Sequence, residues 1–178
     1  MKHIKLKNIK AFVFDVDGVL TDGGIFADLN GELYRVYNAK DGFALRMAFM
    51  NGFKLGIITG GRSQTIVKRM LTCGLKEENI YLNSRDKLAD FMDFCKKNNV
   101  KPEEVMFFGD DAPDVPVFKV CGCGICPADA CRDAAEAADI MSEYNGGHSF
   151  VREEVEKVMR KQGRWILDIE EYKKHYTF

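Results

Sequence analysis

The sequence predicts an α/β fold, a doubly wound parallel sheet, from the alternation of apolar runs with helical patterns. The apolar runs lie at residues 11–16, 53–59 and 105–110. Because they are apolar at nearly every position, they are typical of central strands that helices cover on both faces. The helical patterns lie at residues 41–51, 63–72 and 86–98. Strands and helices that alternate in this way build a parallel sheet with right-handed crossovers.

The ends of these helices carry matching signals. Gly52 would end the first helix, and Ser63 would cap the start of the second. Asn98 and Asn99 would close the third, just ahead of Pro102. Three further elements complete the alternation: a strand at residues 79–82, a helix from about 112 to 119, and a strand within CGCGICPA at 121–128.

Residues 24–37 depart from this rhythm and predict an antiparallel hairpin after the first strand. Asn30-Gly31 is a two-residue turn signal of the kind that joins hairpin strands. The hairpin would expose apolar side chains, namely Ile25, Phe26, Leu33, Tyr34 and Tyr37. Exposed apolar surface of this kind favours an oligomer contact or a lid over the site.

Composition narrows the possible classes of protein. The chain has 178 residues, a net charge of -1 and 46% hydrophobic residues, which suits one domain over residues 1–178 with a well-formed core. The balanced charge offers no footprint for nucleic acid. No apolar run approaches the roughly 20 residues that a membrane span requires, and residues 1–10 lack the apolar segment of a signal peptide. We therefore expect a soluble cytoplasmic protein without a nucleic-acid or membrane partner.

Four of the six cysteines crowd together at Cys121, Cys123, Cys126 and Cys131. The cluster superficially suggests a zinc site, but its spacing is not that of paired C-x2-C knuckles. In a reducing compartment, thiols on a buried strand explain it better.

Polar residues stand at the carboxyl ends of the predicted strands: Asp15 and Asp17, then Thr59, then Asp110. Because ligands bind outside the carboxyl ends of parallel strands, these side chains should meet in one crevice with Lys87 from a following helix. Carboxylates held so close need a cation, and hard oxygen ligands around an octahedral site select Mg²⁺. A metal ion, a lysine and a threonine hydroxyl together form a clamp for phosphate.

These residues lie in four motifs that resemble those of the haloacid-dehalogenase-type phosphatases. The motifs are DVDGVLTDG at 15–23, residues 57–60, Lys87, and GDDAPD at 109–114. The resemblance covers nearly the whole chain and implies a Rossmann-like fold, a Mg²⁺ cofactor and hydrolysis of a phosphate monoester. Most relatives carry an inserted cap domain, but here only the hairpin fits before the first helix, and no cap fits after Thr59.

Family roles carry over to the matching residues. Asp15 would be the nucleophile that forms an aspartyl-phosphate, and Asp17 the general acid–base. The residues implied to hold the transferring phosphate and the substrate are Thr59, Gly60, Arg62 and Lys87, of which Thr59 and Lys87 count as catalytic. The groups implied to bind Mg²⁺ are Asp15, Asp110 and the backbone carbonyl of Asp17.

For several other charged residues the sequence allows two roles, one in the site and one as an ordinary cap or surface residue. Asp111 and Asp114 would support the metal site, although Asp114 also suits the N-terminus of a helix. Arg62 would contact the substrate, or would stand exposed at a helix start. Four more residues would face the substrate or a neighbouring subunit, or would serve as ordinary caps and surface residues: Lys40, Asp41, His148 and Arg152.

Within that family, the sequence is most similar to capless phosphatases of 3-deoxy-D-manno-octulosonate 8-phosphate, an eight-carbon sugar acid. The supporting stretches are DVDGVLTDGGIF, NAKDGFALRM at 38–47, ITGGRS at 58–63, GDDAPD, and GGHSFVREEVEKVM at 146–159. In that family four subunits assemble through the hairpin, and the C-terminal tail of one covers the next active site. The resemblance implies a homotetramer with a tail at about 160–178, acting in lipopolysaccharide synthesis.

Two alternatives remain open. A phosphatase for a nine-carbon sugar acid, a nononate or neuraminate 9-phosphate, would share all four motifs, and Arg62 favours the eight-carbon substrate. A receiver-like phospho-binding module from a response regulator would share the sheet, the phosphorylated Asp, the Thr and the Lys. In receiver domains, however, the acidic pair ends the first strand and the phosphorylated Asp ends the third.

Overall fold

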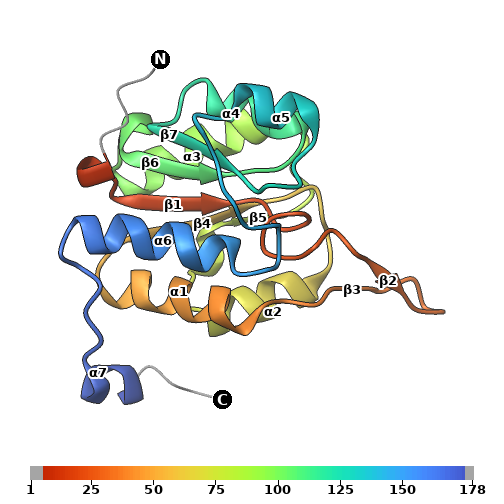
Figure 1. Cartoon of the computed structure of the whole chain (residues 1–178). Helices are drawn as coiled ribbons and strands as arrows, with labels where there is room; N and C mark the ends of the chain where they lie inside the picture. Colours follow the sequence, from red (N-terminus) through yellow and green to blue (C-terminus); the bar gives the residue numbers. More distant parts are fainter. Residues whose placement is uncertain (1–5, 175–178) are drawn as a thin grey trace.

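The computed structural model of the chain describes residues 6–174 (Figure 1). Six strands form one sheet in the order β5-β4-β1-β6-β7-β8, and every adjacent pair is parallel. Their bounds are β1 Ala11–Phe14, β4 Lys54–Ile58, β5 Ile80–Tyr81, β6 Val105–Phe108, β7 Cys123–Cys126 and β8 Ile140–Met141. The chain winds outward from β1 in both directions, so the predicted doubly wound sheet is confirmed.

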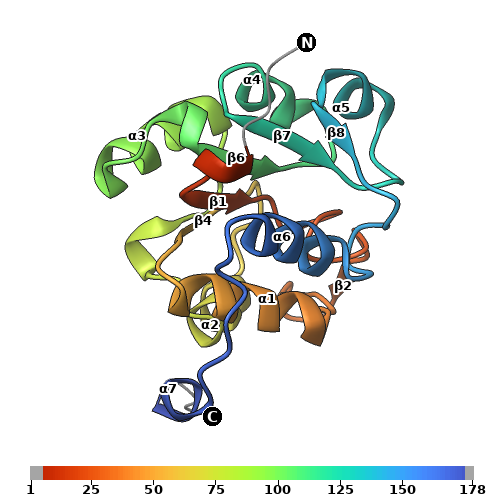
Figure 2. The same cartoon turned by 60° about the vertical axis from the view of Figure 1, so that its left-hand side comes forward.

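Helices cover both faces of the sheet (Figures 1 and 2). One layer holds α1 (Ala39–Met50), α2 (Gln64–Thr72) and α6 (Phe150–Lys161), and the other holds α3 (Lys87–Asn98), α4 (Val115–Phe118) and α5 (Arg132–Ala137). Short 3-10 turns occupy Leu6–Asn8, Glu77–Asn79, Pro102–Glu104 and Ala112–Asp114. Ser63 caps α2 as predicted, because its side chain accepts from the backbone of Thr65.

The side chains of each central strand pack alternately into two separate cores, one on each face of the sheet. On β1, Phe12 and Phe14 belong to the core under α1 and α6, whereas Val13 belongs to the core under α3 and α4. The same alternation on β7 sends Cys123 to the first core and Cys126 to the second. The predicted buried strand within the cysteine cluster is therefore confirmed, and these two thiols lie on opposite faces of the sheet.

The central strands are shorter than their apolar runs predict. β1 ends at Phe14 and β6 at Phe108, so the acids expected at the strand ends lie in the loops just beyond. After Asp15 the chain turns tightly, because the backbone carbonyl of Val16 accepts from the amides of Leu20 and Thr21. The loops, rather than the strands, aim the carboxylates.

A hairpin projects from the loop after β1, as predicted (Figure 1). It pairs β2 (Phe26–Ala27) with β3 (Leu33–Tyr34). The predicted two-residue turn is wrong: the amide of Asp28 donates to Glu32, so residues 29–31 form the loop. The Asp28 carboxylate accepts from the amides of Asn30 and Glu32, and Gly31 takes the left-handed conformation with φ +79° that glycine allows.

The segment after Gly146 forms a helix that the sequence did not predict, and the tail follows it close to the expected start at about residue 160. Residues 150–161 form α6, whose Phe150, Val151 and Val155 are fully buried in the core. The tail therefore begins after Lys161, and its last residues, 175–178, lie outside the described part of the chain. The tail carries α7 (Ile169–Lys174), which buries no residue, and it touches its own chain where Trp165 and Tyr172 meet the ring of Phe43. No helix within residues 6–174 is long and apolar enough to span a membrane.

Arg152 and Trp165 fasten this tail to its own chain. The Arg152 guanidinium lies 4.7 Å from the centre of the Trp165 ring and 5.2 Å from that of Phe43 on α1. Such cation–π stacking holds an exposed segment in place. Arg152 also pairs with Glu156 at 2.5 Å. Within its own chain Arg152 is thus held by the tail and by α6, and a contact of Arg152 with a neighbouring subunit stays a prediction.

Asp41 joins α1 to α6. Asn38, not Asp41, caps α1; the Asp41 carboxylate is 1% exposed, and its Oδ1 accepts from the amide of Arg152 at 2.7 Å. Its Oδ2 is buried without a hydrogen-bond partner. Burial raises the pKa of Asp41 to about 6, against the opposing hydrogen bonds from the backbone of Arg152 and Ser149.

We expect Asp41→Asn to stabilise the fold near neutral pH. A carboxyl whose pKa is about 6 when folded and 3.8 when unfolded binds more protons in the native state, so stability falls as pH rises through that window. The variant lacks this penalty. Its free energy of unfolding, relative to wild type, should rise from near zero at low pH to about 3 kcal/mol at neutral pH. Urea unfolding at several pH values measures the difference.

Asp133→Asn is the matched control, because Asp133 is an exposed acid in the first turn of α5. The free energy of unfolding of that variant should differ from that of wild type by no more than about 0.5 kcal/mol at each pH, because Asp133 is a surface residue. If the Asp41→Asn difference did not grow between acidic and neutral pH, the burial argument would fail.

Candidate active site

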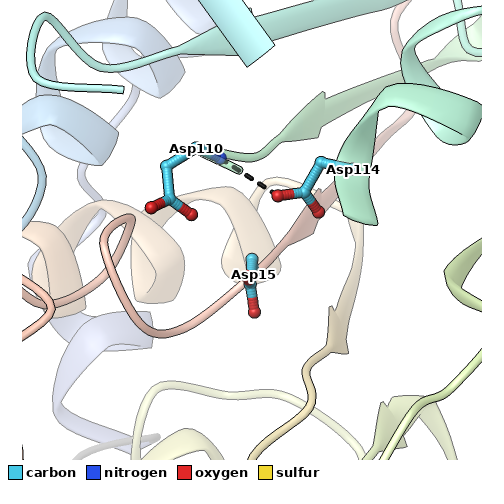
Figure 3. A group of neighbouring side chains, drawn as sticks. All are labelled: Asp15, Asp110 and Asp114. Carbon is cyan, nitrogen blue, oxygen red and sulfur yellow. Dashed lines mark hydrogen bonds between the residues drawn. The ribbon is translucent and has the colours of Figure 1, made fainter. Parts of the chain in front are cut away.

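The predicted catalytic residues converge at the carboxyl ends of β1, β4 and β6. Figure 3 shows Asp15 just after β1, Asp110 just after β6 and Asp114 at the start of the following helix. One carboxylate oxygen from each of the three lies within 4.8 Å of the other two. These carboxylates therefore meet, as the sequence predicts for Asp15 and Asp110, at the point where the chain leaves β1 and β6.

Lys87, the first residue of α3, is the buried cation of this group. Its Nζ lies 2.7 Å from Asp15 Oδ2 and 2.6 Å from Asp114 Oδ1. Its side chain is 6% exposed. Burial by itself would lower the pKa of Lys87, but the charges of Asp15 and Asp114 outweigh burial and raise it above its usual value. The lysine thus stays charged beside the nucleophile candidate.

Both carboxylate oxygens of Asp114 are hydrogen-bonded within the site. Its Oδ1 holds Lys87, while its Oδ2 accepts from the backbone amides of Asp110 and Asp111 at 3.1 and 3.2 Å. Burial raises the pKa of Asp114 to about 6, with the charge of Asp15 acting in the same direction and Lys87 in the opposite one. With both oxygens engaged, Asp114 fits the supporting role expected for it, ahead of that of a plain helix cap.

The surroundings of Asp110 fit a divalent cation. Its Oδ1 is buried and has no hydrogen-bond partner. Burial, followed by the charges of Asp15 and Asp114, raises the pKa of Asp110 to about 7. Its carboxylate lies against Gly18, where a Cβ would sit 2.0 Å from Oδ2. A buried, unpartnered oxygen among like charges is the arrangement that a cation stabilises.

Thr59 and its neighbours form the adjoining loop. Thr59 is 1% exposed, and its Oγ1 accepts from the amide of Gly61 at 3.1 Å. Its backbone bonds to Tyr81 and Ser84 tie this loop to the segment that leads into Lys87. Apart from its two chain neighbours, no residue within 6–174 has an atom less than 4 Å from the place where a Cβ on Gly60 would stand. The loop therefore offers open backbone next to the acidic group.

Arg62 and three other candidates make only local contacts or lie exposed on the surface. Arg62 is exposed at the start of α2, and Lys40 is exposed in the first turn of α1. His148 is exposed, with its Nδ1 2.7 Å from the carbonyl oxygen of Gly146. Asp111 Oδ1 accepts from the amide of Ala112 and caps the turn there. Arg62 remains a predicted substrate contact, because a free cation beside open backbone suits an anion.

Asp17 has an unexpected partner, Arg35. The Arg35 Nε lies 2.6 Å from Asp17 Oδ1, and its Nη2 lies 2.9 Å from Oδ2. Both carboxylate oxygens of Asp17 are thus engaged by a side chain from the base of the hairpin. Sequence reasoning missed Arg35, because it follows β3 at a position where only the fold of the hairpin decides which residue it meets.

Comparison with known proteins shows which family the chain belongs to. Residues 75–152 match a family model described as haloacid dehalogenase-like hydrolase. The 3-deoxy-D-manno-octulosonate 8-phosphate phosphatase of Escherichia coli K12 is 34% identical over 160 residues, which is 90% of this chain and 84% of that protein. The chain belongs to this family of haloacid dehalogenase-like phosphatases.

Solved structures of the family share the fold. The enzyme from Yersinia pestis superposes with a TM-score of 0.86 at 30% identity, covering 90% of this chain and 85% of that one. The enzyme from Moraxella catarrhalis, in complex with magnesium, phosphate and KDO (3-deoxy-D-manno-octulosonate), gives 0.85 at 30% identity, covering 90% and 91%. Family membership excludes the receiver alternative. As in a capless member, only the hairpin segment stands between β1 and α1.

Proposed function

We propose that this chain is a Mg²⁺-dependent phosphatase that hydrolyses 3-deoxy-D-manno-octulosonate 8-phosphate through an aspartyl-phosphate on Asp15. The observation that carries the proposal is the buried group of Asp15, Asp110 and Lys87 at the strand ends. Relatives from Escherichia coli and Yersinia pestis, which share most of the chain, are phosphatases of this sugar phosphate. The phosphatase domain is the whole of residues 1–178.

The reaction proceeds in two displacements. In the first, a carboxylate oxygen of Asp15 attacks the phosphorus, and the bond between phosphorus and the sugar oxygen breaks. Asp17 donates a proton to that oxygen, so the sugar leaves as an alcohol. In the second, water attacks the phosphorus and gives a proton to Asp17, while the bond from phosphorus to Asp15 breaks. Phosphate leaves, and both acids return to their starting states.

The remaining residues hold the charges in place. Thr59, Gly60 and Arg62 bind the phosphoryl oxygens and substrate, and Lys87 neutralises the phosphoryl group beside Asp15. The residues that hold Mg²⁺ are Asp15 and Asp110, with the backbone carbonyl of Asp17. The metal ion supplies a positive charge that lets a phosphoryl dianion approach a carboxylate.

The deciding experiment is phosphate release from matched eight-carbon and nine-carbon sugar-acid phosphates, with several neutral sugar phosphates, in magnesium and in chelator. We expect magnesium-dependent release and the highest kcat/KM for the eight-carbon substrate. A preference for the nine-carbon substrate would keep the mechanism and replace the substrate. No release from any of them would overturn the proposed activity.

We further propose a cytoplasmic homotetramer that assembles through the hairpin, with the tail of one subunit near the active site of the next. The support is exposed apolar surface, since a hairpin that leaves Phe26 69% and Leu29 fully exposed gains by burial between subunits. Ile166 and Ile169 on the tail are 60% and 52% exposed. They suit a contact with a neighbouring subunit in the same way.

Placing charges on the hairpin should dissociate the assembly. In Phe26→Glu combined with Tyr34→Lys, two charges replace apolar surface that the interface would bury, so we expect a smaller particle by light scattering. Met92→Glu on α3 is the control, because Met92 is also an exposed apolar residue, 46% exposed, but lies far from the hairpin. An unshifted particle size for the hairpin variant would refute assembly through the hairpin.

A further inference from the structure

Arg35 is a buried cation that meets the active site from the hairpin. Its guanidinium forms a bidentate (two-pronged) ion pair with Asp17, and its Nη1 donates to the carbonyl of Leu33 at 3.2 Å. The side chain of Arg35 is 1% exposed, whereas that of Asp17 is 29% exposed. Asp17 therefore stands between the guanidinium and solvent.

Arg35 also borders the phosphate-holding loop. A Cβ on Gly61 would lie 3.1 Å from Arg35 Nη2 and 3.4 Å from Thr59 Oγ1, so the guanidinium and the threonine hydroxyl flank the same glycine. The neighbouring charge of Asp15 adds to that of Asp17 in raising the pKa of Arg35. The arginine thus lies beside three residues of the proposed reaction, although none of the four sequence motifs contains it.

The ion pair is incompatible with the work assigned to Asp17. Both oxygens of Asp17 accept from Arg35, so neither is free to give a proton to a leaving oxygen. The positive charge of Lys87 is already shared between the carboxylates of Asp15 and Asp114, so it neutralises a phosphoryl group only in part. An incoming phosphoryl dianion could pair with Arg35 through Nε and Nη2 only by replacing the Asp17 carboxylate that occupies them.

We propose that Arg35 exchanges partners during the reaction: it holds the Asp17 carboxylate in the free enzyme and moves to the phosphoryl group when substrate binds. The released Asp17 carboxylate then takes a proton from solvent and gives it to the leaving oxygen. No bond between heavy atoms changes in the exchange; one carboxylate–guanidinium pair is replaced by a phosphoryl–guanidinium pair. Two-pronged pairing suits both partners, because guanidinium matches carboxylate and phosphate geometry equally. The inference rests on the proposed phosphatase function, and it identifies the binding of the phosphoryl group to Arg35 as the event that releases Asp17.

A double-mutant cycle on the binding of inorganic phosphate tests the exchange. Calorimetry in the presence of Mg²⁺ would compare wild type, Asp17→Ala, Arg35→Gln and the double variant. If Asp17 and phosphate compete for Arg35, Asp17→Ala should tighten phosphate binding about tenfold, and the gain should shrink to about twofold or less when Arg35 is absent. Equal gains in both backgrounds would overturn the proposal, because repulsion between Asp17 and phosphate would then explain them without Arg35.

Kinetics supplies an independent readout. With the sugar phosphate as substrate, Arg35→Gln should raise KM about tenfold or more and change kcat less, because the arginine binds the phosphoryl group in both ground and transition states. Arg35→Lys keeps the charge without the two-pronged geometry and should recover part of the lost affinity. Equal kinetics for all three forms would contradict the exchange, even if the glutamine variant were poorly folded, since the lysine variant keeps the buried charge.

Arg160→Gln is the matched control. Arg160 lies in the last turn of α6, pairs with Glu156 and is 62% exposed, so both phosphate affinity and KM should stay at wild-type values. The outcomes also separate this inference from the proposed function. Wild-type enzyme that hydrolyses the sugar phosphate while the cycle is additive would remove the exchange alone, whereas wild-type enzyme that releases no phosphate would remove the function itself.

Discussion

Asp15→Asn is expected to lower kcat by on the order of 10⁴-fold or more, because an amide cannot form the phosphoenzyme that the first displacement requires. The fold should survive. Lys87 keeps its ion pair with Asp114, and the amide oxygen still accepts from the backbone of Val16, as Asp15 Oδ1 does at 2.6 Å. We therefore expect the free energy of unfolding to change by no more than about 1 kcal/mol.

Two measurements check this expectation. Steady-state phosphate release gives kcat, and rapid acid quenching traps the phosphorylated protein, which should be present in wild type and missing in the variant. Asp22→Asn is the control, since Asp22 is an exposed acid on the same loop whose Oδ1 accepts from the amide of Gly24. Substantial turnover by Asp15→Asn, or a phosphoenzyme in it, would show that another residue is the nucleophile.

Lys87→Met is expected to damage both catalysis and stability. The substitution removes the cation shared by Asp15 and Asp114 and leaves two buried carboxylates facing each other. Breaking a buried pair in this way costs about 3 kcal/mol or more. Loss of the charge beside the transferring phosphoryl group should lower kcat/KM by roughly 10³-fold. Chemical unfolding and phosphate release measure the two effects separately.

Lys97→Met is a matched control on the same helix. Lys97 pairs with Asp93 at 2.7 Å, but the two side chains are 49% and 44% exposed. An exposed pair of this kind contributes at most about 1 kcal/mol, and activity should be unchanged. Similar losses in the two lysine variants would mean that Lys87 acts through helix stability and not through its buried charge. Added Mg²⁺ should partly restore the stability of Lys87→Met, because a cation would again separate the carboxylates.

Much of the site could be predicted from sequence, because strand ends are local features. The apolar run before Asp15 predicts a buried strand, and parallel strands bring their carboxyl ends to one edge. Asp15, Thr59 and Asp110 therefore had to lie near one another once the doubly wound sheet was predicted. The role of Ser63 as the N-cap of α2 could be predicted as well, since a helix cap depends only on the residues beside it.

Contacts between distant segments could not be predicted in this way. Asp114 carried two interpretations until the structure placed its oxygens on Lys87 and on the amides of Asp110 and Asp111. The partner of Asp17 is Arg35, which lies 18 positions along the chain at the base of the hairpin. The path of the hairpin sets that pairing, and no motif spacing records it.

The C-terminal region shows the same limit. The pattern of Phe150, Val151 and Val155 is that of an amphipathic helix, but the sequence prediction assigned no helix to residues 150–161. The sequence by itself determined the parallel sheet, the acids beyond its central strands and the family, because apolar runs and short motifs are encoded locally. Only the tertiary structure decided that α6 completes the core, that Asp41 lies buried beneath it and that Arg35 holds Asp17, because each depends on segments that meet through packing across the fold.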